Sequence, residues 1–235
     1  MKRTDRNIPP VSKRLEAAGA LVREGAVIAD IGTDHAYLPI RLTLENRISF
    51  AIASDIVDGP LRSAERNIAA FGIGEDRIKL MKTDGLRGVE LYKPSDILIC
   101  GMGGELIARI ISGSEYVKDP EISLILQPMT REEKLRFFLA KNGFAIKDED
   151  IVYEDNKLYQ LILASYDGVK REISPESALL GAVNIEKKSP EFFMLLEKKI
   201  KALTKQINGL GTAGREDKEI SSLLCVLEEI RRGRL

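Results

Sequence analysis

Short hydrophobic runs punctuate the first two thirds of the chain, and most of them end at a glycine or an acidic residue. Runs of this kind are typical of buried parallel strands. They predict strands over residues 26–31, 48–54, 77–81, 96–100 and 122–126. Apolar residues at helical spacing and helix-terminating glycines predict helices between them, over residues 12–24, 36–46, 58–71 and 105–111. A Thr130–Glu133 capping box predicts a further helix that ends at Asn142-Gly143.

The pattern changes after residue 143. Two apolar runs, 144–154 and 158–166, flank Asp155-Asn156-Lys157, and turn residues between two such runs indicate a β-hairpin. Five strand–helix units followed by a hairpin imply an α/β fold. Its sheet should be open, seven-stranded and mostly parallel, with one antiparallel strand.

The composition shifts again after about residue 167. Ser189-Pro190 is a favourable start for a helix, whose apolar face would hold Phe193, Leu196, Ile200, Leu203 and Ile207. Gly209, Gly211 and Gly214 are expected to break the chain before a second amphipathic helix over residues 220–230. We therefore expect two domains, residues 1–166 with an N-terminal helix and residues 167–235 as an antiparallel helical hairpin.

The composition limits the chemistry. Charge is balanced, with 36 basic and 36 acidic residues, which excludes nucleic-acid binding by bulk charge but not by a local basic patch. His35 is the one histidine, and Cys100 and Cys225 are the two cysteines, so we expect neither a metal site nor a disulfide framework. Both cysteines are expected to be buried and inert. The chain shows no signal peptide and no membrane span, which favours a cytosolic protein.

Candidate chemistry lies at the predicted strand ends. In an open α/β sheet, ligands bind beyond the carboxyl ends of the strands, at a topological switch point. Small or acidic residues end strand after strand here, namely Asp30, Asp55, Asp84-Gly85, Gly101-Met102-Gly103-Gly104 and Gln127-Pro128. This pattern is typical of a nucleoside pocket, in which Asp55 would accept hydrogen bonds from ribose hydroxyls and Asp84 or its neighbours would face an adenine edge.

The loop after the first strand discriminates between cofactors. A dinucleotide fold needs G-x-G-x-x-G, but here Gly32 is followed by Asp34 where the second glycine should stand. A carboxylate would repel pyrophosphate and attract a cation, which favours S-adenosylmethionine, with its sulfonium and ammonium groups, over NAD. The alternative for Asp34 alone is that it caps the following helix.

Several motifs, in the right order, resemble the bacterial tRNA (adenine-22-N1)-methyltransferases. The segment Asp30-Ile31-Gly32-Thr33-Asp34-His35-Ala36-Tyr37-Leu38-Pro39 is similar to the family's DIG[ST]DHAYLP signature. Ser12-Lys13-Arg14-Leu15, Gly101-Met102-Gly103-Gly104 and Leu124-Ile125-Leu126-Gln127-Pro128 match its SKRL, GMGG and LILQP motifs. Glu154-Asp155-Asn156-Lys157-Leu158-Tyr159 resembles its EDGKxY hairpin, with Asn156 in place of glycine.

The resemblance implies a class I, Rossmann-like methyltransferase fold in the first domain, with S-adenosylmethionine as the methyl donor and N1 of adenine 22 in the tRNA D-arm as the acceptor. It implies that the methionine part of the cofactor lies among Asp30, Gly32, Thr33, Asp34, Tyr37 and Leu38. Asp55 would hold the ribose, and Ile56, Asp84 and Gly85 would frame the adenine. Gly101 and Met102 would close the site near the sulfonium.

Catalysis should depend mainly on positioning, because N1 of neutral adenine already carries an in-plane lone pair that can attack the methyl group. The product is a cation, which Asp34 could stabilise, and a base-paired target must first be flipped out. No catalytic residue is certain; the candidates are Asp34, His35, Tyr37 and Gly103. For His35 the alternative is a structural histidine at a helix start.

Basic residues crowd the N-terminal segment, where phosphate contacts would position tRNA without reading its sequence. We expect tRNA contacts from Arg3, Arg6, Lys13, Arg14, Gln127 and Pro128. We expect a monomer that needs no metal. Two alternatives remain open: the same fold acting on another RNA site or a small metabolite, and a non-catalytic tRNA-binding scaffold.

Overall fold

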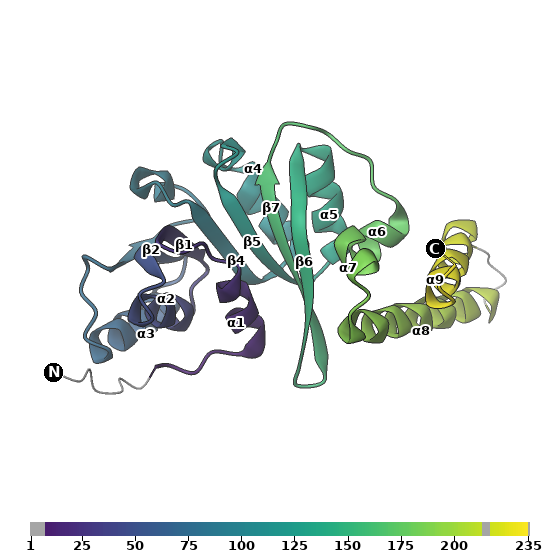
Figure 1. Cartoon of the computed structure of the whole chain (residues 1–235), viewed down its shortest axis with the longest axis horizontal. Helices are drawn as coiled ribbons and strands as arrows, with labels where there is room; N and C mark the ends of the chain where they lie inside the picture. Colours follow the sequence, from purple (N-terminus) through teal and green to yellow (C-terminus); the bar gives the residue numbers. More distant parts are fainter. Residues whose placement is uncertain (1–7, 213–216, 235) are drawn as a thin grey trace. The chain divides into compact units, whose positions relative to one another are not determined.

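The computed structural model describes residues 8–212 and 217–234, and Figure 1 shows the course of the chain. The chain divides into two compact units, Met1–Arg171 and Glu172–Leu235. Within the described residues, no helix is both long enough and apolar enough to cross a bilayer.

The first unit is built on a single seven-stranded sheet with the order β3-β2-β1-β4-β5-β7-β6. Its strands are β1 (Ala26–Ile31), β2 (Ile48–Asp55), β3 (Ile78–Lys82), β4 (Asp96–Gly103), β5 (Ser123–Thr130), β6 (Phe144–Glu154) and β7 (Lys157–Tyr166). The pairs among β1 to β5 are all parallel, whereas β7 runs antiparallel to both β5 and β6. The predicted mostly parallel sheet with one antiparallel strand is therefore confirmed.

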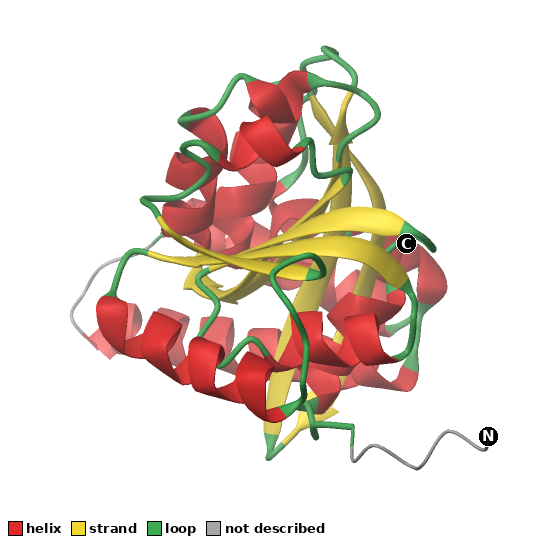
Figure 2. Ribbon diagram, turned by 90° about the vertical axis from the view of Figure 1, so that its left-hand side faces the viewer, coloured by secondary structure: helices red, strands yellow, loops and turns green. Residues whose placement is uncertain are grey.

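Helices cover both faces of this sheet, as Figure 2 shows. The unit contains α1 (Lys13–Ala20), α2 (Tyr37–Leu44), α3 (Asp58–Ala70), α4 (Gly104–Ser112) and α5 (Glu132–Lys141), with short 3-10 turns at Val89–Tyr92 and Tyr116–Lys118. One core joins α1, α2 and α3 to one face of the sheet, and a second core joins α4 and α5 to the other. Together with the strand order, this three-layer arrangement confirms the predicted Rossmann-like α/β architecture.

Each central strand contributes side chains to both cores, because successive side chains point to opposite faces of the sheet. Leu98 of β4 packs in the core with Leu38 of α2. Its neighbours Ile97 and Ile99 pack in the other core, with Ile107 of α4. All of these residues are buried, which explains why the strands appear in the sequence as continuous apolar runs rather than alternating ones.

Two predicted helix boundaries were wrong. The first helix ends at Ala20 rather than near residue 24. The Thr130–Glu133 capping box does not form, because Thr130 is still part of β5 and pairs with Gly103. Instead, Arg131 precedes α5 in a left-handed conformation, with φ of 59°, and provides no side-chain cap.

The second unit is helical and contains α6 (Pro175–Leu180), α7 (Ala182–Lys187), α8 (Pro190–Thr212) and α9 (Lys218–Arg231). The predicted start of α8 is confirmed, since Ser189 Oγ accepts a 3.1 Å hydrogen bond from the Phe192 backbone N–H. The short helices α6 and α7 were not predicted. Helix α8 also continues through Gly209 and Gly211, where nothing lies close enough to oppose the helix. Gly214 lies outside the described residues.

Side chains in the second unit correct two further expectations. Phe192 is buried in α8 whereas Phe193, which was placed on the apolar face, is exposed. Cys225 of α9 is exposed rather than buried in the core. Both errors arise because a broad apolar helix face tells little about which of its edges the neighbouring helices cover.

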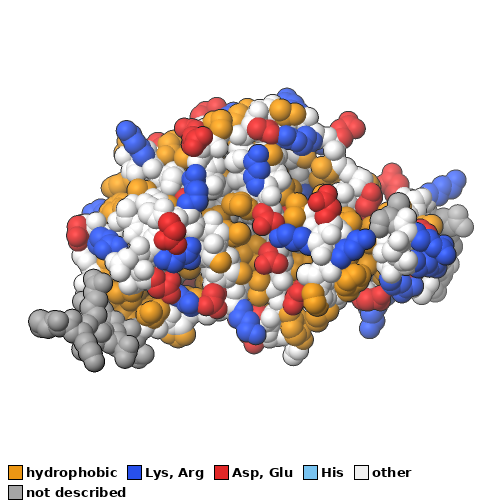
Figure 3. Space-filling view, viewed as in Figure 1, with side chains coloured by type: hydrophobic (Ala, Val, Ile, Leu, Met, Phe, Trp, Pro, Cys, Tyr) orange, Lys and Arg blue, Asp and Glu red, His pale blue; other side chains and the backbone are white. Residues whose placement is uncertain are grey.

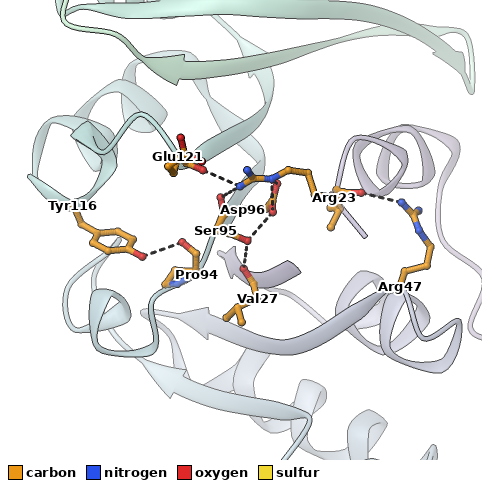
Figure 4. Close-up of polar contacts among 9 residues, drawn as sticks. Arg23, Val27, Arg47, Pro94, Ser95, Asp96, Tyr116 and Glu121 are labelled. Carbon is orange, nitrogen blue, oxygen red and sulfur yellow. Dashed lines mark hydrogen bonds and ion pairs between the residues drawn. The ribbon is translucent and has the colours of Figure 1, made fainter. Parts of the chain in front are cut away.

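The amino ends of β1 and β4 carry a polar cluster that is satisfied within the protein (Figure 4). Asp96, with no exposed surface, accepts 3.1 Å hydrogen bonds from Arg23 Nε and a 3.0 Å bond from Ser95 Oγ. Arg23 Nη2 donates to the carbonyl oxygens of Ser95 and Glu121. Arg23 therefore stabilises the edge of the sheet opposite the strand ends that carry the candidate chemistry.

Candidate active site

A cavity of about 290 Å³ lies at the carboxyl ends of β1 and β4. Its walls are Arg14 and Leu15 of α1, Asp30, residues 32–38, and Cys100 with Gly101. These strands lie side by side at the point where the strand order reverses from β1 to β4. The cavity therefore occupies the topological switch point at which open α/β sheets bind ligands.

The β1–α2 loop brings its backbone close to the cavity. Gly32 has φ of +78°, and the backbone N–H groups of Gly32 and Thr33 both donate 2.8 Å hydrogen bonds to Ser54 O of β2. A Cβ on Gly32 would lie 2.1 Å from Met102 Cε, the end of a flexible side chain that would have to move aside. The glycine of the DIG motif is thus favoured mainly by its left-handed backbone conformation.

Asp30 carries a perturbed carboxyl group at the floor of the cavity. Desolvation raises its pKa to about 6, and the negative charge of Asp55 adds to the rise. Thr33 is close enough to lower this pKa in part, yet its buried Oγ1 makes no hydrogen bond of normal geometry with any described residue. A raised carboxyl pKa beside an unsatisfied hydroxyl is a combination found at ligand-binding sites.

Asp34, His35 and Tyr37 lie together at the mouth of the cavity. Asp34 is 75% exposed, and its Oδ2 lies 3.3 Å from His35 Nε2. The His35 ring stacks on Tyr37 with centroids 5.3 Å apart. Helix α2 begins after Ala36, which has φ of 55°, and no side chain caps it. The alternative role of Asp34 as a helix cap is therefore wrong.

Asp55 ends β2 on the side of the cavity toward β3. Its Oδ1 accepts a 2.8 Å hydrogen bond from the Val57 backbone, while Oδ2 has no donor among the described residues. Ile56 beside it is 57% exposed and offers an apolar surface next to the carboxylate. A carboxylate with a free oxygen next to an exposed apolar surface matches what a ribose and an attached base require.

Asp84 and Gly85 line a second cavity, of about 560 Å³, between the end of β3 and α4. Leu106 and Ile110 of α4 supply apolar walls, and a Cβ on Gly85 would lie 3.4 Å from Ile110. The predicted ribose and adenine residues thus occupy neighbouring strand ends, β2 and β3. The residues predicted for the methionine part line the first cavity.

The Gly101-Met102-Gly103-Gly104 motif joins β4 to α4 along an irregular path beside β5. Gly101 has φ of +82° and faces the first cavity. A Cβ on Gly104 would lie 2.4 Å from the Arg131 carbonyl oxygen, and one on Gly103 would lie 3.2 Å from Thr130 Oγ1. The first glycine of the motif therefore shapes the site, while the last allows α4 and α5 to approach each other.

The sequence did not predict that the Ser12–Leu15 motif contacts the Glu154–Tyr159 hairpin motif. Glu154 at the end of β6 accepts hydrogen bonds from the backbone N–H groups of Lys13, at 2.6 Å, and Arg14, at 3.5 Å. Its carboxylate therefore binds the N-terminus of α1, where backbone donors and the helix dipole favour a negative charge. The motifs are 140 residues apart, and no local pattern in the sequence indicates this contact.

The residues predicted to contact tRNA are dispersed. Lys13 is exposed, whereas Gln127 and Pro128 are buried at the end of β5. Gln127 accepts a 2.7 Å hydrogen bond from Arg14 Nη1 and donates a 2.9 Å bond to Pro128 O. Arg3 and Arg6 lie outside the described residues. Within the described part of the N-terminal segment, Lys13 is therefore best placed to meet a phosphate.

Cys100 lies on the cavity wall and is unreactive. Desolvation raises the pKa of its thiol to about 12, with a contribution from the charge of Asp30, so the nucleophilic thiolate is scarce at neutral pH. The prediction that Cys100 is inert agrees with this environment. Among the described residues, no group of three or more potential metal ligands is close enough to hold an ion.

Comparison with known proteins agrees with this geometry. Residues 11–162 match the model of a family described as a methyltransferase domain. The tRNA (adenine(22)-N(1))-methyltransferase of Bacillus subtilis is 39% identical over 166 residues, which cover 68% of this chain and 69% of that protein.

Solved structures extend the similarity over almost the whole length. M. capricolum TrmK, determined with S-adenosyl-homocysteine, aligns with a TM-score of 0.77 at 28% identity over 95% of this chain and 97% of its own. A Streptococcus pneumoniae protein determined with S-adenosyl-L-methionine aligns with a TM-score of 0.82 at 32% identity, covering 94% of this chain and 99% of that one.

Proposed function

This chain belongs to the bacterial tRNA (adenine-22-N1)-methyltransferase family, and we propose that it methylates N1 of adenine 22 in tRNA with S-adenosylmethionine as the donor. The observation that carries the proposal is that the carboxylates of Asp30 and Asp34 line a cavity at the switch point of the sheet, with Asp55 near enough for its charge to act on Asp30. This acidic surround favours a cationic cofactor and disfavours the pyrophosphate of a dinucleotide.

The residues present fit S-adenosylmethionine. Thr33 Oγ1 is buried and unsatisfied among the described residues, so it can bond a ligand that enters the cavity. Gly32 and Gly101 keep side chains out of the space, and Asp30 supplies an anion for a positively charged group. When bound, this cofactor supplies a methyl group already activated on a sulfonium. We assign its methionine part to Asp30, Gly32, Thr33, Asp34, Tyr37 and Leu38.

The nucleoside part of the cofactor is assigned to the neighbouring strand ends. Asp55, whose Oδ2 is free among the described residues, would accept hydrogen bonds from the ribose hydroxyls. Exposed Ile56 would cover one face of the adenine, and Asp84 with Gly85 would meet its edge. Gly101 and Met102 would border the sulfonium from β4.

The residues at the cavity mouth are assigned to the acceptor adenine. Adenine N1 needs no base to remove a proton, so Asp34, His35, Tyr37 and Gly103 would act by position and charge. Asp34 is exposed and negative at this mouth, where it would offset the positive charge that the adenine gains on N1-methylation. The stacked rings of His35 and Tyr37 provide an aromatic surface against which a flipped-out base can lie.

The tRNA contacts are part of the same proposal. Basic and acidic side chains are interspersed over most of the face in Figure 3, so on this face phosphate contacts of the first unit would come from individual residues. Exposed Lys13 is the described candidate, and Arg3 and Arg6 extend the prediction into the N-terminal segment. We propose that the reaction takes place in the cytoplasm, where tRNA is found, and that the protein is a monomer that works without metal.

Methylation of unmodified tRNA by the purified full chain, with the product nucleoside mapped, tests this function. We expect 1-methyladenosine at position 22 and no methylation of a tRNA in which adenine 22 is replaced by guanine. Methylation at another position would indicate the same fold acting on another RNA site. Cofactor binding with no incorporation into tRNA would instead indicate a non-catalytic scaffold.

A further inference from the structure

The exposed side chains at the end of β5 belong to the residues that follow Gln127 and Pro128. Those two, predicted to contact tRNA, are buried, whereas Met129 is 40% exposed and the side chain of Arg131 is 64% exposed. Pairing of β5 with β4 continues as far as Gly103, a residue assigned to the acceptor adenine. Met129 and Arg131 therefore lie beside the part of β4 at which the acceptor is expected.

This segment and the β1–α2 loop lie on opposite sides of the end of β4, because the strand order is β1-β4-β5. The loop carries the stacked rings of His35 and Tyr37. On the β5 side, Met129 Sδ lies 3.5 Å from Gln127 Nε2, and Gln127 Oε1 accepts the hydrogen bond of Arg14, a wall residue of the first cavity. A base that enters between the two sides would meet aromatic rings on one and a thioether side chain on the other.

Arg131 has a strained backbone that the packing of two helices enforces. Its φ of 59° lies in the left-handed region, which a residue with a side chain adopts at a cost, and such strain is frequent at functional sites. A Cβ on Gly104 would lie 2.4 Å from the Arg131 carbonyl oxygen, so the start of α4 packs directly against this peptide. The same oxygen accepts hydrogen bonds from the backbone N–H groups of Lys134 and Leu135. The fold therefore fixes the direction in which the Arg131 side chain leaves the backbone.

The Arg131 guanidinium has only a weak partner within the protein. Glu133 Oε1 lies 3.9 Å from Nη1, and the side chain of Arg131 makes no hydrogen bond with a described residue. Glu132 and Glu133 are half-buried whereas Arg131 and Lys134 are exposed, so the outward charge of this segment is positive. An exposed guanidinium beside the acceptor site matches the phosphates on either side of the target adenosine.

We propose that Arg131 binds a phosphate that flanks the target adenosine of tRNA, and that Met129 packs on the adenine opposite the rings of His35 and Tyr37. This inference rests on the proposed function and adds Arg131 to Lys13 as a phosphate contact. A flipped-out adenosine loses its stacking partners within the RNA, and contacts with both its base and its backbone offset that loss. Arg131 and Met129 hold the nucleotide, and neither exchanges a proton with it.

The test pairs a charge change in the protein with a charge change at a single phosphate. Two tRNAs are assembled, with a neutral methylphosphonate on the 5′ side or on the 3′ side of adenosine 22. The natural full chain should bind one of them about threefold to tenfold more weakly than the all-phosphate tRNA. With Arg131→Gln the same methylphosphonate should change affinity by less than about twofold, because the partner of that phosphate is already absent.

Further variants separate the charge, the backbone and the base contact. Arg131→Gln should lower the dependence of log Kd on log salt concentration by about one unit, as the loss of one phosphate contact requires. Arg131→Gly should do the same without lowering the melting temperature, because glycine accepts the left-handed backbone. Met129→Ala should leave the salt dependence unchanged but slow single-turnover methylation about threefold to tenfold.

Lys134→Gln is the matched control for charge. It removes an exposed positive charge three residues from Arg131, so it should retain the full effect of the methylphosphonate. All of these variants should bind S-adenosylmethionine as the natural protein does, since neither side of the contact involves the cofactor. Calorimetry with S-adenosylmethionine measures this affinity.

The outcomes distinguish this inference from the proposed function. Undiminished sensitivity of Arg131→Gln to the methylphosphonate, or no effect of either methylphosphonate on the natural protein, would overturn the phosphate contact while tRNA is still methylated. Equal loss of sensitivity in Lys134→Gln would show a diffuse charge effect and overturn it as well. Normal methylation by Met129→Ala would overturn the base contact. No methylation of all-phosphate tRNA by the natural protein would instead overturn the proposed function.

Discussion

The acidic residues at the two ends of the sheet differ in whether the protein itself satisfies their hydrogen bonds. At the amino end, Asp96 is fully buried and its carboxylate is satisfied by Arg23 and Ser95. At the carboxyl end, Asp30 has a pKa raised to about 6 and Asp55 keeps one oxygen free among the described residues. A carboxylate that is satisfied inside the protein contributes to stability, whereas an unsatisfied one costs stability and is available for a ligand.

Removal of the satisfied acid should have the largest effect on stability. Asp96→Ala deletes charged hydrogen bonds in a buried position, so we expect the free energy of unfolding to fall by about 3 to 4 kcal/mol. Chemical denaturation measures this change. The affinity for S-adenosylmethionine of the remaining folded protein should stay within about twofold, since Asp96 lies at the end of β4 remote from the cavity. A stable Asp96→Ala protein would contradict the contrast between the two ends.

Removal of an unsatisfied acid should increase the free energy of unfolding rather than lower it. Asp30→Asn eliminates a carboxyl whose pKa rises from 3.8 to about 6 on folding, which corresponds to a gain of up to about 3 kcal/mol in the cofactor-free protein at neutral pH. The same change should weaken binding of S-adenosylmethionine. Denaturation and calorimetry on one preparation measure both quantities. A variant that is destabilised and binds the cofactor normally would show that Asp30 is a structural residue.

The pH dependence gives a second measure of the Asp30 effect. Below about pH 4 the carboxyl is protonated in both the folded and the unfolded chain, so Asp30→Asn should have little effect on stability there. Between about pH 4 and 6 the unfolded chain ionises first, so the natural protein loses stability relative to the variant as pH rises. Above about pH 6 the difference should remain constant. A difference independent of pH across this range would contradict the perturbed pKa.

Loss of the ribose acid should affect binding more than folding. Asp55→Ala removes the carboxylate assigned to the ribose hydroxyls, so we expect cofactor affinity to fall about tenfold to thirtyfold, or about 1.4 to 2 kcal/mol. Affinity for tRNA should change less. Calorimetry with S-adenosylmethionine and filter binding with tRNA compare the two, and equal loss of both with the fold intact would contradict the ribose assignment.

The smallest expected effect on stability is at the cavity mouth. Asp34 is 75% exposed, so Asp34→Asn should change the free energy of unfolding by less than about 0.5 kcal/mol. Turnover on tRNA should nevertheless fall, because the variant removes the negative charge that is assigned to the cationic product. Single-turnover methylation compared with cofactor affinity separates these effects, and unaltered turnover would exclude an electrostatic role for Asp34.

Sequence patterns predicted strands better than they predicted contacts between distant segments. The buried strand 26–31 has the same bounds in the structure as in the prediction, because its apolar run is bounded by Gly25 and Gly32. The Thr130–Glu133 capping box was wrong because pairing of Thr130 with Gly103 extends β5. Tertiary pairing thus overrode a local helix-start signal, and the sequence does not encode that pairing locally.

In the candidate site, too, local patterns could be predicted from the sequence whereas contacts between distant segments could not. The residues at the strand ends, such as Asp30 and Asp55, could be identified in advance, because the carboxyl ends of parallel strands in one sheet must meet at one edge. The position of Arg14 could not be predicted, since a basic residue in a basic N-terminal segment has the same appearance whether it faces RNA or a cavity. Its contacts with Gln127 and Tyr159 join segments that are more than 110 residues apart.

The sequence by itself determined the strands of the sheet, the helices between them and where the acidic strand ends lie, because hydrophobic periodicity and turn residues act over a few positions. Only the tertiary structure decided which charges are satisfied. The raised pKa of Asp30, the oxygen of Asp55 that has no donor among the described residues, and the inward position of Arg14 all depend on neighbours that the fold brings together. Desolvation and ion pairing act through space over a few ångströms, and positions along the chain do not report those distances.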